Sequence, residues 1–441
     1  MGRENAMEAR RAWSREARDL RAPEIRGIYP IPRYAGLSLA NLPATLLRRM
    51  GTEPPREILP PLDAARVPPG DAPRTSVVLL MDSLGWRQLE EFADQARTPL
   101  ERSVAQWMEA RGHPITTVFP STTSSALLSL STGTPPARHG IVGYTEYFPR
   151  WGAIYNTLTL SPVGASAGSV LWDPDTFAAL WNPVPTIFQH LSPSVVLLPE
   201  ELAGSGFSRI AYQGARRIPF RSLSDLEHLL TALLCQERSQ RPRLVWIYWD
   251  ALDRVAHVRG PLPGVAEHEI LHMALTLASV ARNVPAETLG EVELFVTGDH
   301  GHLDLDPRAV RNADGDEPLF HLLARPPSGE RRAVFLQAAR GRLEELGAYL
   351  ATSLPPDWLV LPREEVARAD LLGPGPNHPE LWERLGDFLV LPPPGASWVR
   401  QPPGTSRKES GPLLGAHGGL TPDELLVPLV VARGRELREL P

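Results

Sequence analysis

Continuous apolar runs alternate with helical periodicity along most of the chain. The predicted strands lie within residues 75–82, 114–120, 243–250, 291–301 and 424–434, and the first of them is a continuous apolar run that ends at Asp82. Runs of this kind are typical of central parallel strands, which other elements cover on both faces. Apolar residues recur at helical spacing over residues 86–110, 121–133, 222–237 and 267–284. Strands that alternate with helices predict an α/β fold with a central, mainly parallel sheet.

Shorter elements between residues 305 and 410 interrupt this pattern. Loop boundaries rich in Pro and Gly stand at 326–328 and 373–376. The predicted organisation has four parts: an N-terminal extension (1–70), the first part of the catalytic α/β core (71–304), an inserted cap-like region (305–410) and the last part of the core (411–441).

Composition narrows the classes of function. The 441 residues carry a formal net charge of −6 without a basic block, so specific nucleic-acid binding is not expected. The single cysteine, Cys235, excludes an intrachain disulfide and a Cys-based zinc site. No run of about 18 apolar residues occurs, and the charged N-terminus lacks the apolar core of a secretory signal. We therefore expect a cytoplasmic protein without a membrane segment.

The stretch WDALDRVAH (249–257) places Asp253 and His257 just past a predicted strand. Their i, i+4 spacing puts both side chains on one face of a helical turn. Such a pair is often only a surface contact, so a metal site requires further ligands from other parts of the chain. Asp250 fits either a turn residue or a partner that orients a ligand.

Further ligands are expected where other strands end. Asp82 ends the first strong strand, Asp299 and His300 follow a later one, and His417 precedes the last. Ligands in α/β sheets bind beyond the carboxyl ends of strands, so we expect these side chains to meet. Together with Asp253 and His257 they suit two divalent cations about 4 Å apart, most simply zinc, with manganese or iron as alternatives.

A cluster of hydroxyl residues, STTSS (121–125), opens the predicted helix at 121–133. Ser and Thr are favoured at helix N-termini. A hydroxyl beside two cations loses its proton readily and could attack a phosphorus centre. The cations and the helix N–H groups would then hold the developing oxyanions.

The order of these motifs resembles the alkaline phosphatase superfamily, and within it the nucleotide pyrophosphatase/type I phosphodiesterase branch. The motifs are MDSLG, FPSTTSSALLSLSTGTPPARHGIVGY, DRVAHVRGP, TGDHGH and GAHGGLTPDE, in that order. The resemblance implies an alkaline-phosphatase-like three-layer sandwich, a central mainly parallel sheet and an inserted cap-like region. It also implies two zinc ions. One faces substrate and attacking water, held by Asp253, His257 and His417; the other is held by Asp82, Thr123, Asp299 and His300.

Thr123 matches the nucleophile of that family, and its neighbours Thr122, Ser121 and Ser124 remain alternatives. Tyr144 stands where this branch has a phosphate-binding Asn, and its hydroxyl would donate the corresponding hydrogen bond.

Three other polar residues in these motifs are interpreted as structural and not as metal ligands. His139 is expected to order its loop, and His302 and Asp304 are interpreted as loop residues.

The resemblance implies hydrolysis of phosphodiester or pyrophosphate bonds in small, nucleotide-type substrates through a covalent phospho-threonine intermediate. A phosphomonoesterase or phosphonate hydrolase on the same cations is the first alternative. It would favour an added cation near the site, such as Arg138 or Arg254. A catalytically silent scaffold of the same fold is the second alternative.

Overall fold

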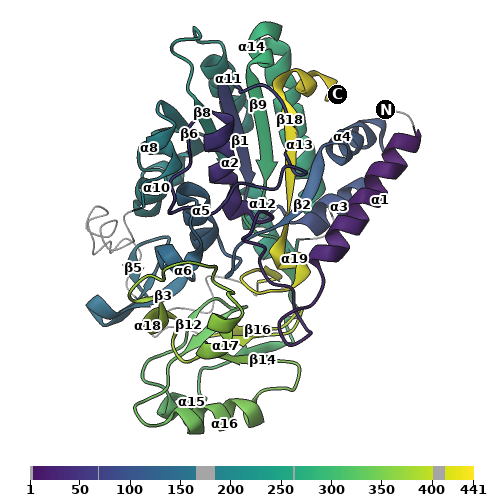
Figure 1. Ribbon diagram of the computed structural model, residues 1–441. Coiled ribbons are helices and arrows are strands. Elements are labelled where there is room, and N and C mark those ends of the chain that lie inside the picture. Colours follow the sequence, from purple (N-terminus) through teal and green to yellow (C-terminus); the bar gives the residue numbers. More distant parts are fainter. Residues whose placement is uncertain (1–2, 68, 165–183, 262–263, 401–412) are drawn as a thin grey trace.

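The computed structural model describes residues 3–67, 69–164, 184–261, 264–400 and 413–441. Its larger sheet has seven strands in the order β2-β18-β9-β1-β8-β6-β7 (Figure 1). Every pairing in this sheet is parallel except those of β18, which is antiparallel to both neighbours. The strands are β1 (Thr75–Met81), β2 (Gly112–Thr116), β6 (Ser194–Pro199), β7 (Arg216–Phe220), β8 (Leu244–Trp249), β9 (Val292–Thr297) and β18 (Leu426–Arg433).

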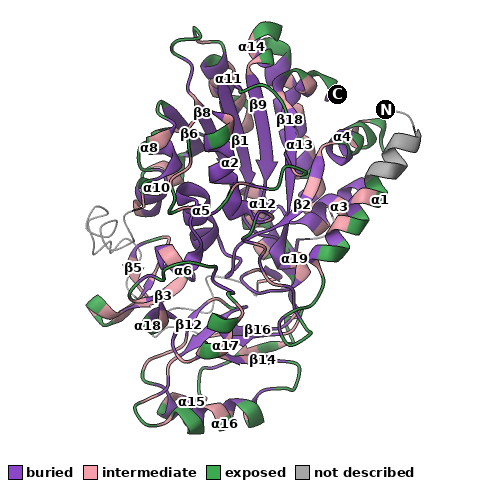
Figure 2. Ribbon diagram, in the orientation of Figure 1, coloured by how far each residue is buried: buried purple, intermediate pink, exposed green. Residues whose placement is uncertain are grey.

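Strand β1 shows why the sheet needs cover on both faces. All seven of its residues are buried, as the purple strands of Figure 2 illustrate. Val77 and Leu79 belong to one hydrophobic cluster, whereas Val78 and Leu80 belong to another. Successive side chains of a strand point to opposite faces, so these clusters are the two interfaces of a three-layer sandwich. The predicted fold class is confirmed.

Two sets of helices form the outer layers. Residues of α3, α4, α11 and α13 share the cluster of Val77, and residues of α2, α5, α8 and α10 share that of Val78. The first set is α3 (Trp86–Gln95), α4 (Pro99–Glu109), α11 (Leu223–Leu234) and α13 (Val265–Asn283). The second set is α2 (Leu42–Arg49), α5 (Thr123–Thr132), α8 (Ile187–His190) and α10 (Gly206–Ala211).

The N-terminal helix α1 (Arg3–Leu20) contributes to the core. Trp13 is buried, donates from Nε1 to the Gly112 carbonyl oxygen at 2.8 Å, and packs against Trp86 with ring centroids 4.6 Å apart. The segment that the sequence suggests as an extension therefore covers one edge of the main sheet.

A second seven-stranded sheet, in the order β14-β15-β13-β12-β3-β4-β5, makes the cap. Its strands pair antiparallel throughout. They are β3 (Thr145–Phe148), β4 (Ala153–Asn156), β5 (Ser161–Pro162), β12 (Ser328–Gly329), β13 (Val334–Leu336), β14 (Leu359–Pro362) and β15 (Phe388–Leu391).

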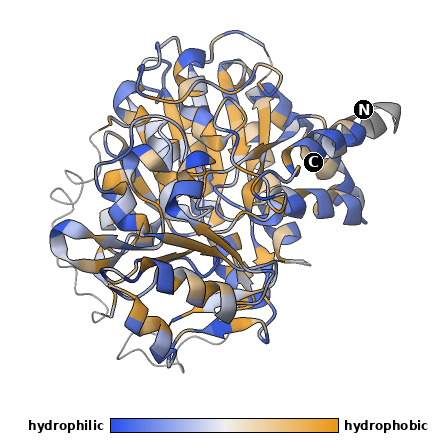
Figure 3. Ribbon diagram, turned by 60° about the horizontal axis from the view of Figure 1, so that its bottom comes forward, coloured by the Kyte–Doolittle hydropathy of each residue, from blue (hydrophilic) through white to orange (hydrophobic). Residues whose placement is uncertain are grey.

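The cap differs from the predicted region 305–410 because β3, β4 and β5 come from residues 145–162. Strand β3 joins β12 through the pair Thr145 and Gly329. A sheet of short strands takes partners from distant segments, and periodicity along the chain does not report that pairing. Figure 3 shows the hydrophobic residues concentrated in the strands of both sheets.

The remaining elements are short and connect these layers. Two small ladders pair β10 (Leu303–Asp304) with β17 (Gly415–Ala416) and β11 (Val310–Asn312) with β16 (Ser397–Val399). The other helices are η1 (Leu39–Asn41), α6 (Pro136–His139), η2 (Pro149–Trp151), α9 (Glu200–Ala203), α12 (Ala251–Arg259), α14 (Ala286–Gly290), α15 (Glu317–Leu322), α16 (Leu343–Ser353), α17 (Arg363–Arg368), α18 (Leu381–Leu385), α19 (Pro422–Leu425) and η3 (Gly434–Glu439).

Two details depart from the expected elements. The helix expected at 86–110 is split into α3 and α4, because the Thr98 side chain caps a new helix that begins at Pro99. Strands β6 and β7 were not anticipated; β7 is an edge strand that begins with Arg216 and Arg217. Among the described residues, no helix is long and apolar enough to cross a membrane.

Candidate metal centre

Three neighbouring strands deliver the first candidate ligands to one edge of the main sheet. β1 pairs in parallel register with β8 on one side and β9 on the other, so their carboxyl ends meet. Asp82 directly follows β1, and its amide donates to the Trp249 carbonyl oxygen at the end of β8 at 2.8 Å. Asp299 and His300 follow β9 and are fully buried.

Asp253 is the centre of one cluster. Its Oδ1 lies 3.4 Å from His257 Nε2, one turn later on α12, and 3.7 Å from His417 Nε2. A third imidazole, that of His302, places Nδ1 at 3.5 Å from the same oxygen. The i, i+4 pair predicted from the sequence therefore faces histidines from two other loops.

The second cluster consists of Asp82, Asp299 and His300. His300 Nε2 lies 3.4 Å from Asp82 Oδ1 and 3.5 Å from Asp299 Oδ2. Thr123 Oγ1, at the first residue of α5, lies 3.1 Å from the same nitrogen. The rings of His300 and His417 stack with centroids 3.7 Å apart, so the two clusters adjoin.

These clusters fit cations. Within each of three triads, one ligand atom per residue lies within 4.8 Å of the others. Asp82 Oδ1 and Asp299 Oδ2 are buried without a hydrogen-bond partner among the described residues, and a buried carboxylate oxygen in that state needs a counter-charge. The triads are Asp253, His257 and His302; Asp253, His300 and His417; and Asp82, Asp299 and His300.

Ionisation of Asp82 leads to the same conclusion. Burial, followed by the charges of Asp299 and Asp253, raises the pKa of Asp82 well above its usual value. The phenol of Tyr248 donates a hydrogen bond to Asp82 and opposes this rise only in part. Bound cations would relieve the repulsion among the three carboxylates.

The pKa shifts of Asp253 and His417 each favour the form that binds a metal. Burial alone would raise the pKa of Asp253, but a hydrogen bond from His302 and the charges of His257 and His417 lower it well below the usual value. Burial, with His300 next, lowers the pKa of His417 well below its ordinary value. An ionised carboxylate and neutral imidazoles are ligand forms that bind zinc.

The four hydroxyl groups at the start of α5 have different hydrogen-bond partners, and these partners distinguish Thr123 from its alternatives. Ser121 Oγ donates to the Gly419 carbonyl oxygen at 2.7 Å, and Ser124 Oγ donates to that of Gly143 at 3.1 Å. The Thr122 hydroxyl donates to Glu330. Only the hydroxyl of Thr123, of these four, faces a candidate metal ligand.

Ser83 is a functional residue that the sequence did not reveal. It has a φ of 69°, in the left-handed region where non-glycine residues are strained. In this conformation its Oγ donates to Asp253 Oδ1 at 2.6 Å and lies 2.9 Å from His302 Nδ1, while its amide donates to Asp299 Oδ1 at 3.0 Å. One residue thus orients ligands of both clusters.

His302 lies in the loop before β10, as interpreted, but it also contacts the Asp253 cluster. Its side chain is buried beside Asp253 and packs edge-on against His257, with ring centroids 4.6 Å apart. The TGDHGH motif contained the signal, because His302 lies two residues from His300 and just before the short strand β10. Asp304 was also interpreted as a loop residue, but it ends the short strand β10, where it is exposed and belongs to none of the clusters.

Glycine in the TGDHGH motif is required by close backbone approach. A Cβ on Gly301 would stand 1.9 Å from the Asp423 carbonyl oxygen, and one on Gly298 would stand 2.1 Å from that of Leu84. These contacts hold the loop of Asp299 and His300 against its neighbours.

The remaining candidates lie around the site. Tyr144 is exposed at the junction of the core with the cap, and its hydroxyl is hydrogen-bonded to Asn156. Arg254, on α12, pairs with Glu201 at 3.0 Å and with Asp250 at 3.4 Å. Asp250 therefore serves as an ion-pair partner at the N-cap of α12.

His139 behaves as expected of a loop-ordering residue. It is buried, accepts a hydrogen bond from the Ile141 amide at Nδ1, and lies 3.1 Å from Ser129 Oγ through Nε2.

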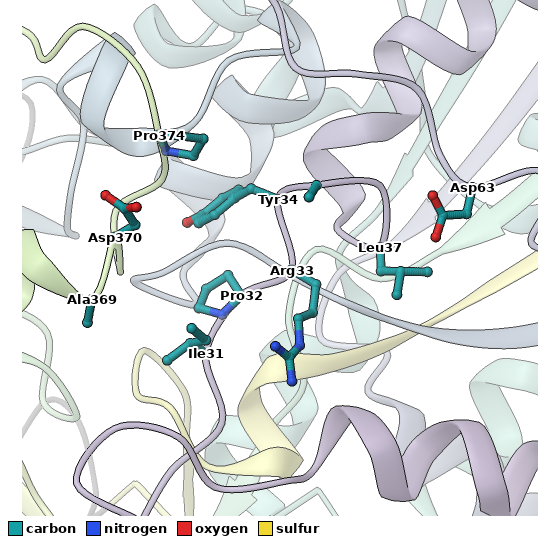
Figure 4. Close-up of a pocket in the computed structure, with 10 residues that line it drawn as sticks. Ile31, Pro32, Arg33, Tyr34, Leu37, Asp63, Ala369, Asp370 and Pro374 are labelled. Carbon is teal, nitrogen blue, oxygen red and sulfur yellow. The ribbon is translucent and has the colours of Figure 1, made fainter.

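A pocket lies apart from the candidate ligands. It has a volume of about 410 Å³ and is lined by the segment around Pro32 and Tyr34 and by the loop with Asp370 and Pro374 (Figure 4). None of the candidate ligands lines it. This pocket is therefore separate from the candidate metal centre.

Sequence comparison assigns most of the chain to one family. The family model described as type I phosphodiesterase/nucleotide pyrophosphatase matches residues 76–420. This range includes every candidate ligand. No curated protein matches the sequence significantly.

Solved structures share the fold at low sequence identity. Murine ectonucleotide pyrophosphatase/phosphodiesterase 5 is 17% identical, with a TM-score of 0.58 over 80% of this chain and 87% of that chain. An inactive variant of it, in complex with AMP, is 16% identical with a TM-score of 0.57 over 83% and 93%. Phosphonoacetate hydrolase from Sinorhizobium meliloti 1021, in complex with phosphonoformate, is 19% identical with a TM-score of 0.57 over 83% and 95%.

Proposed function

The chain belongs to the type I phosphodiesterase/nucleotide pyrophosphatase family of metal-dependent phosphoester hydrolases, and from this premise we propose a narrower activity. The protein cleaves phosphodiester or pyrophosphate bonds in small, nucleotide-type substrates. The reaction passes through a phosphothreonine at Thr123 in a site that holds two divalent cations, most simply zinc.

The position of Thr123 carries this proposal. Its hydroxyl lies 3.1 Å from His300 Nε2, at the first residue of α5, where the helix N–H groups have no intrahelical partner. Those N–H groups and the helix dipole favour an anionic phosphoryl group. The alternatives Ser121, Thr122 and Ser124 use their hydroxyls elsewhere, which supports Thr123 further.

Two displacements complete the reaction. In the first, Thr123 Oγ1 forms a bond to phosphorus while the bond to the leaving alcohol or nucleoside phosphate breaks. In the second, water displaces Thr123 and restores its hydroxyl. Bound cations would lower the pKa of the attacking hydroxyl and water and stabilise the phosphoryl oxygens. Ser83 and His302 keep Asp253 oriented, and Tyr248 does the same for Asp82.

The assignment of ligands follows the two clusters. We propose that Asp82, Thr123, Asp299 and His300 hold one cation, and that Asp253, His257 and His417 hold the other. His302 is close enough to Asp253 to support the second site through that carboxylate. We also propose Tyr144 as a substrate contact, since it lies at the junction of core and cap. A cytoplasmic location stays a prediction.

A phosphonate hydrolase on the same site is the second candidate. The specific observation is the similarity in fold to phosphonoacetate hydrolase, at a TM-score of 0.57. Arg254 was suggested as a cation that would bind such substrates, but it forms ion pairs with Glu201 and Asp250. A panel of bis-p-nitrophenyl phosphate, p-nitrophenyl phosphate and phosphonoacetate distinguishes the candidates by kcat/KM.

The nucleophile is tested with Thr123→Ala. We expect kcat on bis-p-nitrophenyl phosphate to fall by roughly a thousandfold or more, because the variant lacks the attacking oxygen. Metal content should stay near that of the wild type, because most ligands remain. Thr122→Ala is the matched control and should keep most of the activity. If Thr123→Ala is fully active and Thr122→Ala is inactive, the nucleophile is Thr122.

A further inference from the structure

Glu330 brings a carboxylate from the cap to the candidate active site. It lies in the turn between β12 and β13, and its Oε1 accepts hydrogen bonds from the Thr122 hydroxyl and the Tyr144 amide, both at 2.6 Å. Its side chain also packs on Gly418, where an added Cβ would stand 2.8 Å from Glu330 Cβ. Glu330 therefore contacts the residues adjacent to Thr123 and His417.

The turn that carries Glu330 is held in place. Arg332 is buried and forms a paired interaction with the buried Glu424, at 3.1 and 3.2 Å. The Glu330 amide donates to the Ala333 carbonyl oxygen at 2.8 Å and closes the turn. The carboxylate thus keeps its place beside the site without depending on a flexible loop.

The charge of Glu330 acts on the site. Asp253 is among the groups that raise its pKa, so the two carboxylates lie within electrostatic range. Burial is the largest cause and raises the pKa of Glu330 to about 7, so the group is ionised at pH 8.5. Hydrogen bonds from Thr122 and Tyr144 and the charge of the neighbouring Arg331 oppose this rise only in part.

We propose that Glu330 is a specificity-determining residue that selects monoanionic phosphodiesters over dianionic phosphomonoesters. This inference rests on the proposed function and goes beyond it by naming the side chain that sets the preference. A monoester carries one more negative charge than a diester on the phosphoryl group. A fixed carboxylate next to that group repels the monoester more strongly, and partial burial keeps the repulsion from being screened.

The test is Glu330→Gln, assayed at pH 8.5. The amide oxygen of Gln can accept both hydrogen bonds that Oε1 accepts, so the variant removes the charge and keeps the contacts. The readout is the ratio of kcat/KM for bis-p-nitrophenyl phosphate to kcat/KM for p-nitrophenyl phosphate. We expect this ratio to fall by about tenfold or more, because one unit charge near a partly buried site has an effect of that size.

Glu365→Gln is the matched control. Glu365, on α17, forms an exposed ion pair with Arg26, away from the candidate ligands. Its neutralisation should leave the ratio unchanged. Thermal unfolding and metal content, measured for both variants, establish that Glu330→Gln is folded and loaded.

The outcomes separate the inference from the function on which it rests. A wild-type protein that is loaded with metal and cleaves neither ester would overturn both. A wild-type protein that prefers the diester, with an unchanged ratio in Glu330→Gln, would overturn only the role of Glu330. If Glu365→Gln lowers the ratio as much as Glu330→Gln does, the role of Glu330 is also overturned. The loss of any negative charge would then be enough to change the preference.

Discussion

The Oδ1 atom of Asp253 shows how much of the site depends on single residues. His257, His302 and His417 each place a ring nitrogen within 3.7 Å of it, and Ser83 donates a hydrogen bond to it. The carboxylate is thus oriented before any cation binds. The strained φ of Ser83 is the conformational cost of that orientation, and its polar contacts offset this cost.

Ser83 can be tested apart from the proposed ligands. Ser83→Ala removes the hydroxyl contacts with Asp253, His302 and His300 and keeps the amide bond to Asp299. We expect zinc affinity to fall about tenfold, the usual effect of losing a group that orients a ligand. Competition with a chelating dye measures this affinity.

Ser83→Gly is the control, because glycine adopts a positive φ without strain. It should show the same loss of zinc affinity with a higher melting temperature than Ser83→Ala. Wild-type affinity in both variants would contradict a role for the hydroxyl.

At the level of elements, His139 ties α6 to α5. Its Nδ1 accepts from the Ile141 amide, so Nε2 carries the proton and donates to Ser129 Oγ on α5. Burial is the main cause that lowers the pKa of His139 from 6.5 to about 3. The loop that leads to Tyr144 therefore depends on a neutral imidazole.

This arrangement predicts a pH dependence of stability. The pKa of His139 is lower in the folded state than in the unfolded state. Its contribution to the free energy of unfolding is therefore complete above pH 6.5. It is lost as the pH falls toward 3, because the unfolded state then binds the proton more readily. The free energy of unfolding should lose about 1.4 kcal/mol per pH unit over this range from His139 alone.

The measurement is denaturant unfolding at several pH values, with His139→Asn compared to the wild type. The variant should have a lower stability at pH 7 and a shallower decline below pH 6.5. His228→Asn, which removes an exposed histidine of α11, should keep the wild-type slope. Parallel profiles for His139→Asn and the wild type would exclude this contribution.

At the level of the whole molecule, the site joins parts of the chain that are far apart. The core supplies the candidate ligands at the ends of β1, β8 and β9 and in the loop before β18. The cap supplies Glu330, and the Arg332–Glu424 pair connects the cap to the core. Asp82 and Asp299 are buried carboxylates within this junction, and their repulsion is expected to destabilise the protein unless a cation is present.

Metal removal should therefore lower stability as well as activity. A cation that binds only the folded state, at a hundredfold excess over its Kd, stabilises by about 2.7 kcal/mol per site. We expect chelation to reduce the melting temperature by several degrees and to abolish phosphoester hydrolysis, and added zinc to restore both. Calorimetry with metal analysis measures the effect and the number of ions. Equal melting temperatures with and without metal would contradict cation binding at the clusters.

Some residues of the site could be recognised from the local sequence, and others could not. Asp82, Asp253, Asp299 and His300 were recognisable because each follows a strongly apolar strand, and parallel strands bring their ends together. Ser83 and Glu330 were not recognisable. Their roles depend on a backbone angle and on a turn more than two hundred residues from Thr122, and neither leaves a periodic trace.

The amino-acid sequence by itself determined an α/β fold with a central, mainly parallel sheet and the residue types at the strand ends, because apolar runs and the motifs that follow them are local properties of the chain. The three-layer arrangement was implied by the resemblance of those motifs to a known family. Only the tertiary structure decided that residues 145–162 join the cap and that His302 faces Asp253. It alone placed a carboxylate next to Thr122. These features are contacts between distant segments, and such contacts arise from packing in three dimensions.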